Sequence, residues 1–543
     1  MQRVIFYTLL ALPLTPLPCA CTQEDDTNNV VNQKKTNERV PTQTKITISK
    51  ETTRITQPLT EDGYVDYVAA FNDHLSKGVT PETNAAVACW QAVGPDDVGL
   101  GHDEKFRKRF FNSLEIDEPP TKGKYFVSLW QMAQIKAVRN DMGTDADAVF
   151  EIYNRHLSEV MSAPWKAEAF PSHARWIEAN EDVLDRLLAV LHRKHSYIPQ
   201  IPCKDEMILA VRSPFSSSSR EVARILVTRA MSRAGVGDID SAWQNLLACY
   251  RLASPTRSNG FLIDRQLGIA LEWMACSGCI ALAQNASMMP GQTIKLGRDL
   301  EGLAQSHSLV GQIDVAERYM FLDLGTNLAR GTPRTVKVLE LDTENTGESL
   351  AQVLSTNEID WSETAKIGNL WYDRMVEAAR MPEGPRRIEA LAAVQESLEK
   401  AERQVTDKKQ LADVLALEES DRRKAVSKHV ACALLAIIAP NGHQCEVSEA
   451  RARSMVDFAR ITLALAAYHT EHSEFPENLA SLSPRYLPDV PIDRFSHSAL
   501  QYKKADQGYV IYSFGPDGRD DSGYSRGDRC GDDVSVRFRR KPD

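Results

Sequence analysis

The sequence lacks the short motifs that identify common hydrolases and nucleotide-binding proteins. It contains no His-Glu-x-x-His, no Gly-x-Ser-x-Gly and no glycine-rich phosphate loop followed by lysine. A catalytic site assembled from residues far apart in the chain leaves no such motif, so this absence excludes only the enzyme classes that short motifs define.

A concentrated basic face is also missing. The 543 residues carry a net charge of -10, and the only short basic run is Arg537, Arg539, Arg540 and Lys541 at the end of the chain. Binding to a nucleic-acid backbone needs clustered lysine and arginine, so nucleic acid is not an expected partner. With 43% hydrophobic and 25% charged residues, the composition is typical of a folded globular protein.

Long uninterrupted hydrophobic runs are absent too. The apolar segment 430–439 is too short to span a bilayer and is expected to be a buried helix end. At the N-terminus, Arg3 precedes a short apolar segment that Pro13 and Pro16 would break as a membrane helix. This layout predicts a secretory signal peptide at 1–21, and therefore an exported protein.

The end of the signal resembles a bacterial lipobox, because the small residue Ala20 directly precedes Cys21, although Pro18 stands where leucine is expected. Two outcomes stay open: simple cleavage to a periplasmic protein, or lipid attachment at Cys21, which would be its only membrane association. The polar run 22–60, rich in Thr, Asn, Gln and Lys, predicts a disordered tether. Eight of the ten cysteines follow Cys21, and their pairing is left open.

Residues 61–444 show apolar spacings of three and four that predict a helical domain. Residues 221–252 are expected to form a helical hairpin around Gly235-Val236-Gly237-Asp238, with Asp240 or Ser241 capping its second helix. Residues 264–283 continue as a third helix. The pattern resembles tetratricopeptide (TPR) repeats, but no period of about 34 residues recurs, so the expectation is an irregular, TPR-like helical array.

Residues 449–543 predict a small α+β domain with a long helix packed on an antiparallel sheet. The helix at 449–472 is apolar around most of its circumference, so other elements must cover it. Strands are expected at 500–503 and 509–514, joined by a turn at 505–508, and alternation returns at 534–538.

The phrases FPENLASL, YLPDVPIDRF, QYKK, GYVIYSFGPDG and GDDVSV follow that helix in order. In this order they resemble the globular head of type II secretion major pseudopilins. Phrases in the body, including YVAAFNDHLSKGVTPETNAAVACWQAVGP and WIEAN, resemble a family of large bacterial exported helical proteins of unassigned activity. The N-terminus has no pseudopilin cleavage site, so a filament subunit is not expected.

The pseudopilin resemblance implies a calcium ion held by Asp517, Asp528, Asp532 and Asp533, with backbone carbonyls near Phe514. The residue types agree with this, because calcium takes six to eight oxygen ligands and the glycines in 515–531 let a short loop wrap an ion. Six aspartates would otherwise repel one another: Asp517, Asp520, Asp521, Asp528, Asp532 and Asp533. A solvated acidic turn is the alternative.

Other candidate chemistry has simpler explanations. Cys276 and Cys279 have the CxxC spacing, but no second ligand pair for zinc is present and the segment is helical throughout, so packed cysteines are expected. The cluster His192, Arg193, Lys194 and His195 is expected at a helix end, where positive charge offsets the helix dipole.

The leading functional hypothesis is an exported, non-enzymatic scaffold that binds a protein or envelope partner and ends in a calcium-stabilised, pseudopilin-like head. The alternatives are an envelope hydrolase with its site in the helical body, and an accessory of a type II secretion or pilus system. The oligomeric state is not assigned. A pocket of converging polar groups would favour the enzyme, whereas broad grooves would favour the scaffold.

Overall fold

The computed structural model describes residues 45–94, 104–193, 195–202, 207–208, 215–258, 260–303, 308–331, 350, 352–354, 358–525 and 531–539. The predicted signal peptide, Cys21 and Asp528 lie outside these residues. The described chain is mainly helical with a small three-stranded antiparallel sheet near its C-terminal end, which confirms the predicted fold class at this level.

The chain divides into two compact units, each built from separate segments. The first unit comprises Met1–Val65, Phe321–Asn369 and Glu399–Ala439, and the second comprises Asp66–Met320, Leu370–Leu398 and Pro440–Asp543. This division differs from the sequence prediction, which separated a helical domain at 61–444 from a head at 449–543.

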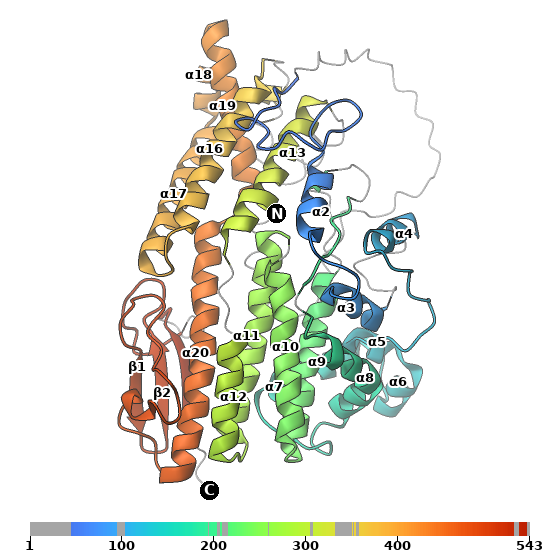
Figure 1. Cartoon of the computed structure of the whole chain (residues 1–543), viewed down its shortest axis with the longest axis vertical. Helices are drawn as coiled ribbons and strands as arrows, with labels where there is room; N and C mark the ends of the chain where they lie inside the picture. The colour runs from blue at the N-terminus through green and yellow to red at the C-terminus, as the bar shows by residue number, and fades with distance from the viewer. Residues whose placement is uncertain are drawn as a thin grey trace. The chain divides into compact units, whose positions relative to one another are not determined.

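Most helices belong wholly to one unit. In the second unit and before residue 318 these are α2 (Tyr67–Ser76), α3 (Ala85–Val93), α4 (Glu104–Ser113), α5 (Leu129–Gln134), α6 (Lys136–Met142), α7 (Ala146–Ser162), α8 (Pro171–Val190), α9 (Phe215–Gly235), α10 (Ile239–Ser258), α11 (Leu262–Asn285), α12 (Pro290–Leu303) and the π-helix η2 (Gln312–Glu317) (Figure 1). Three helices contribute residues to both units: α13 (Arg318–Ala329), α16 (Trp361–Ala379) and α17 (Pro385–Thr406). The first unit also contains α18 (Lys408–Leu415) and α19 (Glu419–Ile438). The second unit ends with α20 (Gly442–His472), the 3-10 helix η3 (Leu479–Leu482) and strands β1 (Gln501–Ala505), β2 (Gly508–Ser513) and β3 (Val534–Arg539).

The predicted helical hairpin is formed by α9 and α10. Gly237 has φ +83°, a left-handed conformation that favours glycine in so tight a connection. The Oδ1 atom of Asp238 accepts a hydrogen bond from the amide of Ser241 at 3.1 Å. Asp238 therefore caps α10, rather than the predicted Asp240 or Ser241.

The third predicted helix, α11, packs against both members of this hairpin. A Cβ atom added to Gly278 would lie 2.6 Å from Cδ2 of Leu246 and 3.1 Å from Cγ1 of Val227. The glycine therefore permits the close approach of α11 to α9 and α10, which lie side by side with it in Figure 1. The hydrophobic core of the second unit forms along these contacts.

Helix α20 joins the helical part of the second unit to its sheet. It packs against α11 and α12 and also against β3, so it is buried along most of its length. This explains the apolar circumference seen in the sequence. The predicted domain boundary at 444–449 falls inside α20, and one continuous core contains side chains from α3 through β3.

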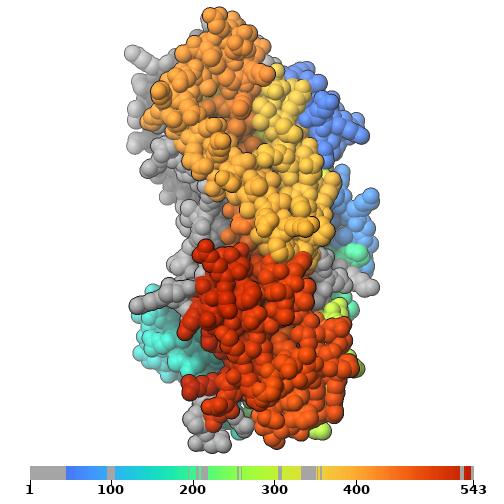
Figure 2. Space-filling model, turned by 90° about the vertical axis from the view of Figure 1, so that its left-hand side faces the viewer, coloured from blue at the N-terminus to red at the C-terminus, as the bar shows by residue number. Residues whose placement is uncertain are grey.

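The sheet has the order β1-β2-β3 with both pairs antiparallel. Ala505 pairs with Gly508, so Asp506 and Gln507 form the turn of the predicted hairpin. The buried Ile511 of β2 pairs with Val536 of β3. Figure 2 shows the sheet region, coloured red, as one continuous surface.

Residues 45–60 pack within the first unit, although their composition predicted part of a disordered tether. Thr52 and Thr53 are buried, and the Nδ2 atom of Asn369 donates to the carbonyls of Glu51 and Thr52, both at 2.9 Å. Arg330 forms an ion pair with Asp62 at 2.7 Å. The threonines fit this packed turn because their hydroxyls satisfy local backbone groups, as in the bond from Thr53 Oγ1 to the carbonyl of Ser49.

Two stretches, Leu262–Asn285 and Glu419–His472, are long and apolar enough to cross a membrane. Most of the residues in their apolar windows are buried inside the protein, as they also are in the core helices of soluble proteins. Their hydropathy is therefore weak evidence for a membrane span.

Candidate metal centre

The acidic loop between β2 and β3 begins at Phe514, and the buried side chain of Asp493 holds this start of the loop in place. The Oδ1 atom of Asp493 accepts hydrogen bonds from Ser513 Oγ at 2.7 Å and from the amide of Phe495 at 2.8 Å. Its Oδ2 atom accepts from the amide of Phe514 at 3.1 Å. The backbone at Phe514, a predicted contributor of ligands, is thus fixed by a residue that the sequence analysis did not single out.

Gly515 then brings the loop against its own far end. It has φ +69°, and an added Cβ atom would lie 2.5 Å from the carbonyl oxygen and 2.6 Å from Oδ1 of Asp532. Glycine is needed here both for the left-handed conformation and for the close approach. The start and the end of the loop are therefore adjacent.

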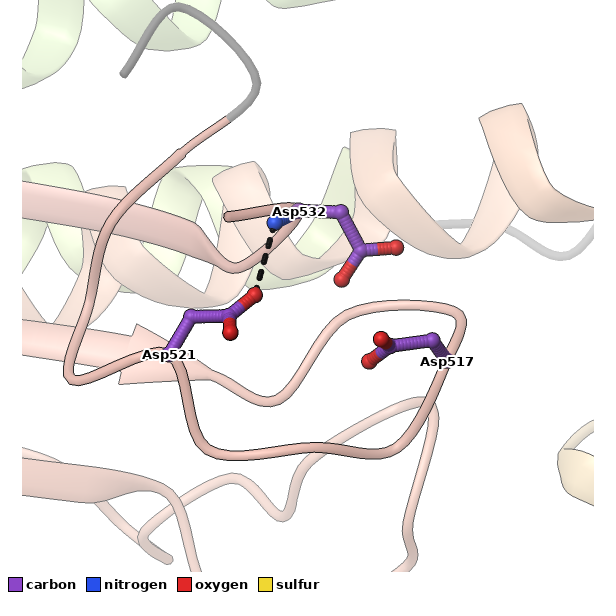
Figure 3. A group of neighbouring side chains, drawn as sticks. All are labelled: Asp517, Asp521 and Asp532. Atoms are coloured by element: carbon purple, nitrogen blue, oxygen red, sulfur yellow. Dashed lines mark hydrogen bonds between the residues drawn. The ribbon is translucent and has the colours of Figure 1, made fainter. Parts of the chain in front are cut away.

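Three aspartates meet at this point. Each of Asp517, Asp521 and Asp532 offers a carboxylate oxygen, and these three oxygens lie within 4.8 Å of one another (Figure 3). The Oδ2 atom of Asp521 also accepts a hydrogen bond from the amide of Asp532 at 2.9 Å. The structure brings together the predicted Asp517 and Asp532, and it adds Asp521, whose only sequence signal was its place in the acidic run.

Asp532 is a carboxylate whose pKa is raised by its surroundings. Burial raises its pKa, and the neighbouring Asp517 raises it further. Its Oδ1 atom is buried and has no hydrogen-bond partner among the described residues. Among the described residues, Arg451 of α20 forms an ion pair with Asp532, with its Nη2 atom 4.0 Å from Oδ2. A second positive charge would therefore be stabilising at this position.

Asp533 was predicted to be a calcium ligand, but it does not lie in the cluster of three aspartates. It is buried, its Oδ2 atom accepts from the amide of Gly523 at 2.8 Å, and its own amide donates to the carbonyl of Tyr524 at 3.1 Å. Burial raises its pKa, and its Oδ1 atom has no hydrogen-bond partner within the described chain. Asp533 is not one of the three clustered aspartates, and its bonds fix the end of the loop.

The donor set fits a hard divalent cation. Carboxylate oxygens are the ligands that such ions prefer, and three of them converge from a loop whose backbone turns at Gly515, Gly518 and Gly523, all with positive φ. Three ionised carboxylates would more than offset the two positive charges of the ion, and backbone carbonyls and water would complete its coordination.

The CxxC cysteines are packed in a helix, and Arg193 of the basic cluster bonds to backbone carbonyls. Cys276 and Cys279 are buried in α11, where burial raises the pKa of both thiols, in agreement with the packing predicted for them. The Nη1 atom of Arg193 donates to the carbonyls of Pro81 and Asn84 at 3.1 and 3.0 Å. Lys194 lies outside the described residues.

Comparisons of the chain with models of protein families, with curated proteins and with solved structures found no match.

Proposed function

We propose that this chain is an exported, non-enzymatic scaffold or binding protein of the cell envelope, with a pseudopilin-like C-terminal head that calcium stabilises. The observation that carries the calcium proposal is the convergence of carboxylate oxygens of Asp517, Asp521 and Asp532 within 4.8 Å. The Oδ1 atom of Asp532 is also buried and has no hydrogen-bond partner among the described residues. Without a cation, these three charges repel one another and oppose closure of the loop.

The scaffold part of the proposal rests on the helical body and on the sequence of the N-terminus. The α9–α10 hairpin and the packing of α11 against it are consistent with an irregular, TPR-like array, an architecture that presents extended surfaces to protein partners. The predicted signal peptide supports export, and Cys21 is the candidate lipid attachment site. The mass of the mature N-terminus distinguishes a lipidated Cys21 from simple cleavage.

Calorimetric titration of the chelator-treated full chain with CaCl2 tests the metal site. We expect measurable heat and a rise in melting temperature, because an ion that binds only the folded state adds about 2.7 kcal/mol of stability at a hundredfold excess over Kd. Asp532→Asn should weaken calcium binding by at least about tenfold. Asp506→Asn, at the exposed turn between β1 and β2, is the matched control and should bind like the wild type.

The stabilisation by calcium should increase as pH rises from acid to neutral. Because the folded-state pKa values of Asp532 and Asp533 are raised above 3.8, the metal-free protein loses stability as pH rises from about 3.8 through these raised values. Calcium should therefore stabilise most at neutral pH and progressively less in acid, where protons compete for the same oxygens. A titration without heat or change in melting temperature, or equal binding by both variants, would reject the site.

A further inference from the structure

Helix α9 carries four arginines, and the two nearer its C-terminal end have acidic partners. The Nη2 atom of Arg229 lies 2.6 Å from Oε1 of Glu181 and 2.6 Å from Oδ1 of Asp185. Arg233 also pairs with Glu181. Both acidic residues belong to α8, so these two arginines join α9 to α8. A buried arginine is normally compensated in this way, because an unpaired charge inside a protein is costly.

The two arginines nearer the start of α9, Arg220 and Arg224, lack such partners. Neither side chain forms a hydrogen bond or an ion pair with any residue that the structure describes. The Nη1 atom of Arg224 is moreover buried without an acceptor from the described chain. Leaving a buried donor without an acceptor is unfavourable, and more so when the donor belongs to a charged group.

The positions of Arg220 and Arg224 add to this cost. They are four residues apart in one helix, so their side chains lie on the same face, one turn from each other, where like charges repel. Both are half-buried, and water and salt therefore screen the repulsion less than at an open surface. Burial lowers the pKa of both guanidinium groups, and the charge of Arg224 lowers that of Arg220 further.

The acidic residue beside the pair, Glu221, compensates it only in part. Its charge raises the pKa of Arg224, against the effect of burial. Its carboxylate is buried, and its Oε2 atom accepts a hydrogen bond from the amide of Leu129, at the start of α5, at 3.2 Å. Among the described residues, one carboxylate thus acts on two guanidinium groups, which leaves positive charge on this face of α9.

This arrangement matches the chemistry of a phosphate group. The donors of a guanidinium group form a planar fork that fits the oxygen atoms of carboxylates and phosphates. A phosphate group carries a charge of about -1.5 to -2 at neutral pH and offers several acceptor oxygens, so one such group can balance and bond both arginines. Because both side chains are only half-buried, an anion can reach them from solvent.

We propose that Arg220 and Arg224 together bind a phosphate group. The phosphate would take the position that a second carboxylate would otherwise need to fill, and it would accept hydrogen bonds from both guanidinium groups. The proposal concerns binding alone, and it is independent of the metal centre and of the scaffold function proposed above.

The test is calorimetric titration of the full chain with sodium phosphate at neutral pH and low ionic strength, without calcium or chelator in the buffer. Sodium methanesulfonate is the comparison, because its anion is also tetrahedral but carries a single charge. We expect phosphate to bind and methanesulfonate to bind at least about tenfold more weakly, the effect of losing one charge-assisted hydrogen bond. Glycerol 3-phosphate is the third probe. If it binds more tightly than phosphate, the group comes from a phosphate monoester; if it binds more weakly, the free ion is the ligand.

Three variants locate the binding. Arg220→Gln and Arg224→Gln should each weaken phosphate binding by at least about tenfold, since each removes a charged donor. Arg298→Gln, at an exposed position of α12, is the matched control and should bind phosphate like the wild type. Circular dichroism melting checks that the variants fold. Phosphate should also raise the melting temperature of the wild type but not that of Arg224→Gln.

Four results would overturn the proposal. These are the absence of heat when the wild type is titrated with phosphate, equal affinity for methanesulfonate, unchanged binding in folded Arg220→Gln and Arg224→Gln proteins, and an equal loss of binding in Arg298→Gln. The last result would show attraction to surface charge in general. If Arg224→Gln does not fold, Arg220→Gln and the comparison of the two anions still decide the question.

Discussion

Glu317 is a buried carboxyl group in the π-helix η2. Its Oε1 atom accepts from the amide of Leu262 at 2.7 Å, and its Oε2 atom is buried without a hydrogen-bond partner in the described part of the chain. Burial raises its pKa to about 8, so the group holds a proton at neutral pH. Ionising Glu317 would place a negative charge in the core, where removing that charge from water is costly.

Glu317→Gln should therefore change the pH profile of stability. Since the folded-state pKa exceeds the unfolded value of 4.5, the wild type loses stability as pH rises from about 4.5 through about 8 and stays level above that. The glutamine variant lacks this loss, so we expect it to be more stable than the wild type above pH 8 by about 1–3 kcal/mol.

Urea unfolding at several pH values measures this difference. Glu396→Gln, at an exposed position of α17, is the matched control and should show no such trend. A difference between wild type and Glu317→Gln that does not grow with pH would contradict the prediction.

The roles of two single residues that shape the acidic loop could not be predicted from the sequence. Asp521 was one member of an acidic run, and nothing local marked it as the partner of Asp517 and Asp532. Asp493 was one residue of a proline-rich connector, yet it fixes the start of the loop. Both roles depend on contacts between residues distant in the chain, which residue type and spacing do not encode.

At the scale of the element, the end of α9 depends on Gly235. An added Cβ atom there would collide with the backbone carbonyl of Trp165, whose amide donates to the carbonyl of Met231 at 3.3 Å. Because a backbone atom cannot move aside as a side chain can, the segment at Trp165 and the helix end are fitted to each other.

Gly235→Ala should destabilise the protein by about 1–3 kcal/mol, the usual cost of forcing extra volume into a packed site. Gly297→Ala, inside α12 with no atom within 4 Å of an added Cβ, is the matched control. It should stabilise by about 0.5–1 kcal/mol through helix propensity. Thermal unfolding of the two variants compares them directly, and equal effects would show that Trp165 does not restrict this position.

Helices and strands that are marked by turn residues or by alternation in the nearby sequence were predicted well. The α9–α10 hairpin follows its glycine turn, and the β1–β2 hairpin follows its strand alternation. The break at Pro440-Asn441-Gly442 is also where α20 begins, because Asn441 Oδ1 accepts from the amide of Gln444 at 2.9 Å. Residues 45–60 were predicted poorly, because a polar composition does not reveal that Asn369 binds their backbone carbonyls.

For the second unit as a whole, α20 is the element that the helical part and the sheet share. Its residue Glu449 contacts Arg265 and Arg257, which are 184 and 192 positions away in the sequence. No local pattern predicts such pairs, which is why the sequence suggested a separate head.

A fragment of residues 442–543 should therefore fail to fold as an independent domain. It would expose the face of α20 that packs on α11 and α12 in the full chain. We expect a broad thermal transition and strong binding of a hydrophobic dye, whereas the full chain should melt cooperatively and bind little dye. A sharp transition in the isolated fragment, without dye binding, would show that the sheet region is autonomous.

The position of α20 also sets the order of events in biosynthesis. Helix α20 begins 139 residues after α12 ends (442 − 303), so a ribosome makes α11 and α12 well before the first residue of α20. The apolar surface of α11 and α12 that α20 covers therefore stays exposed until α20 has been synthesised. A chain that stalls or is clipped before that point should remain open to proteases.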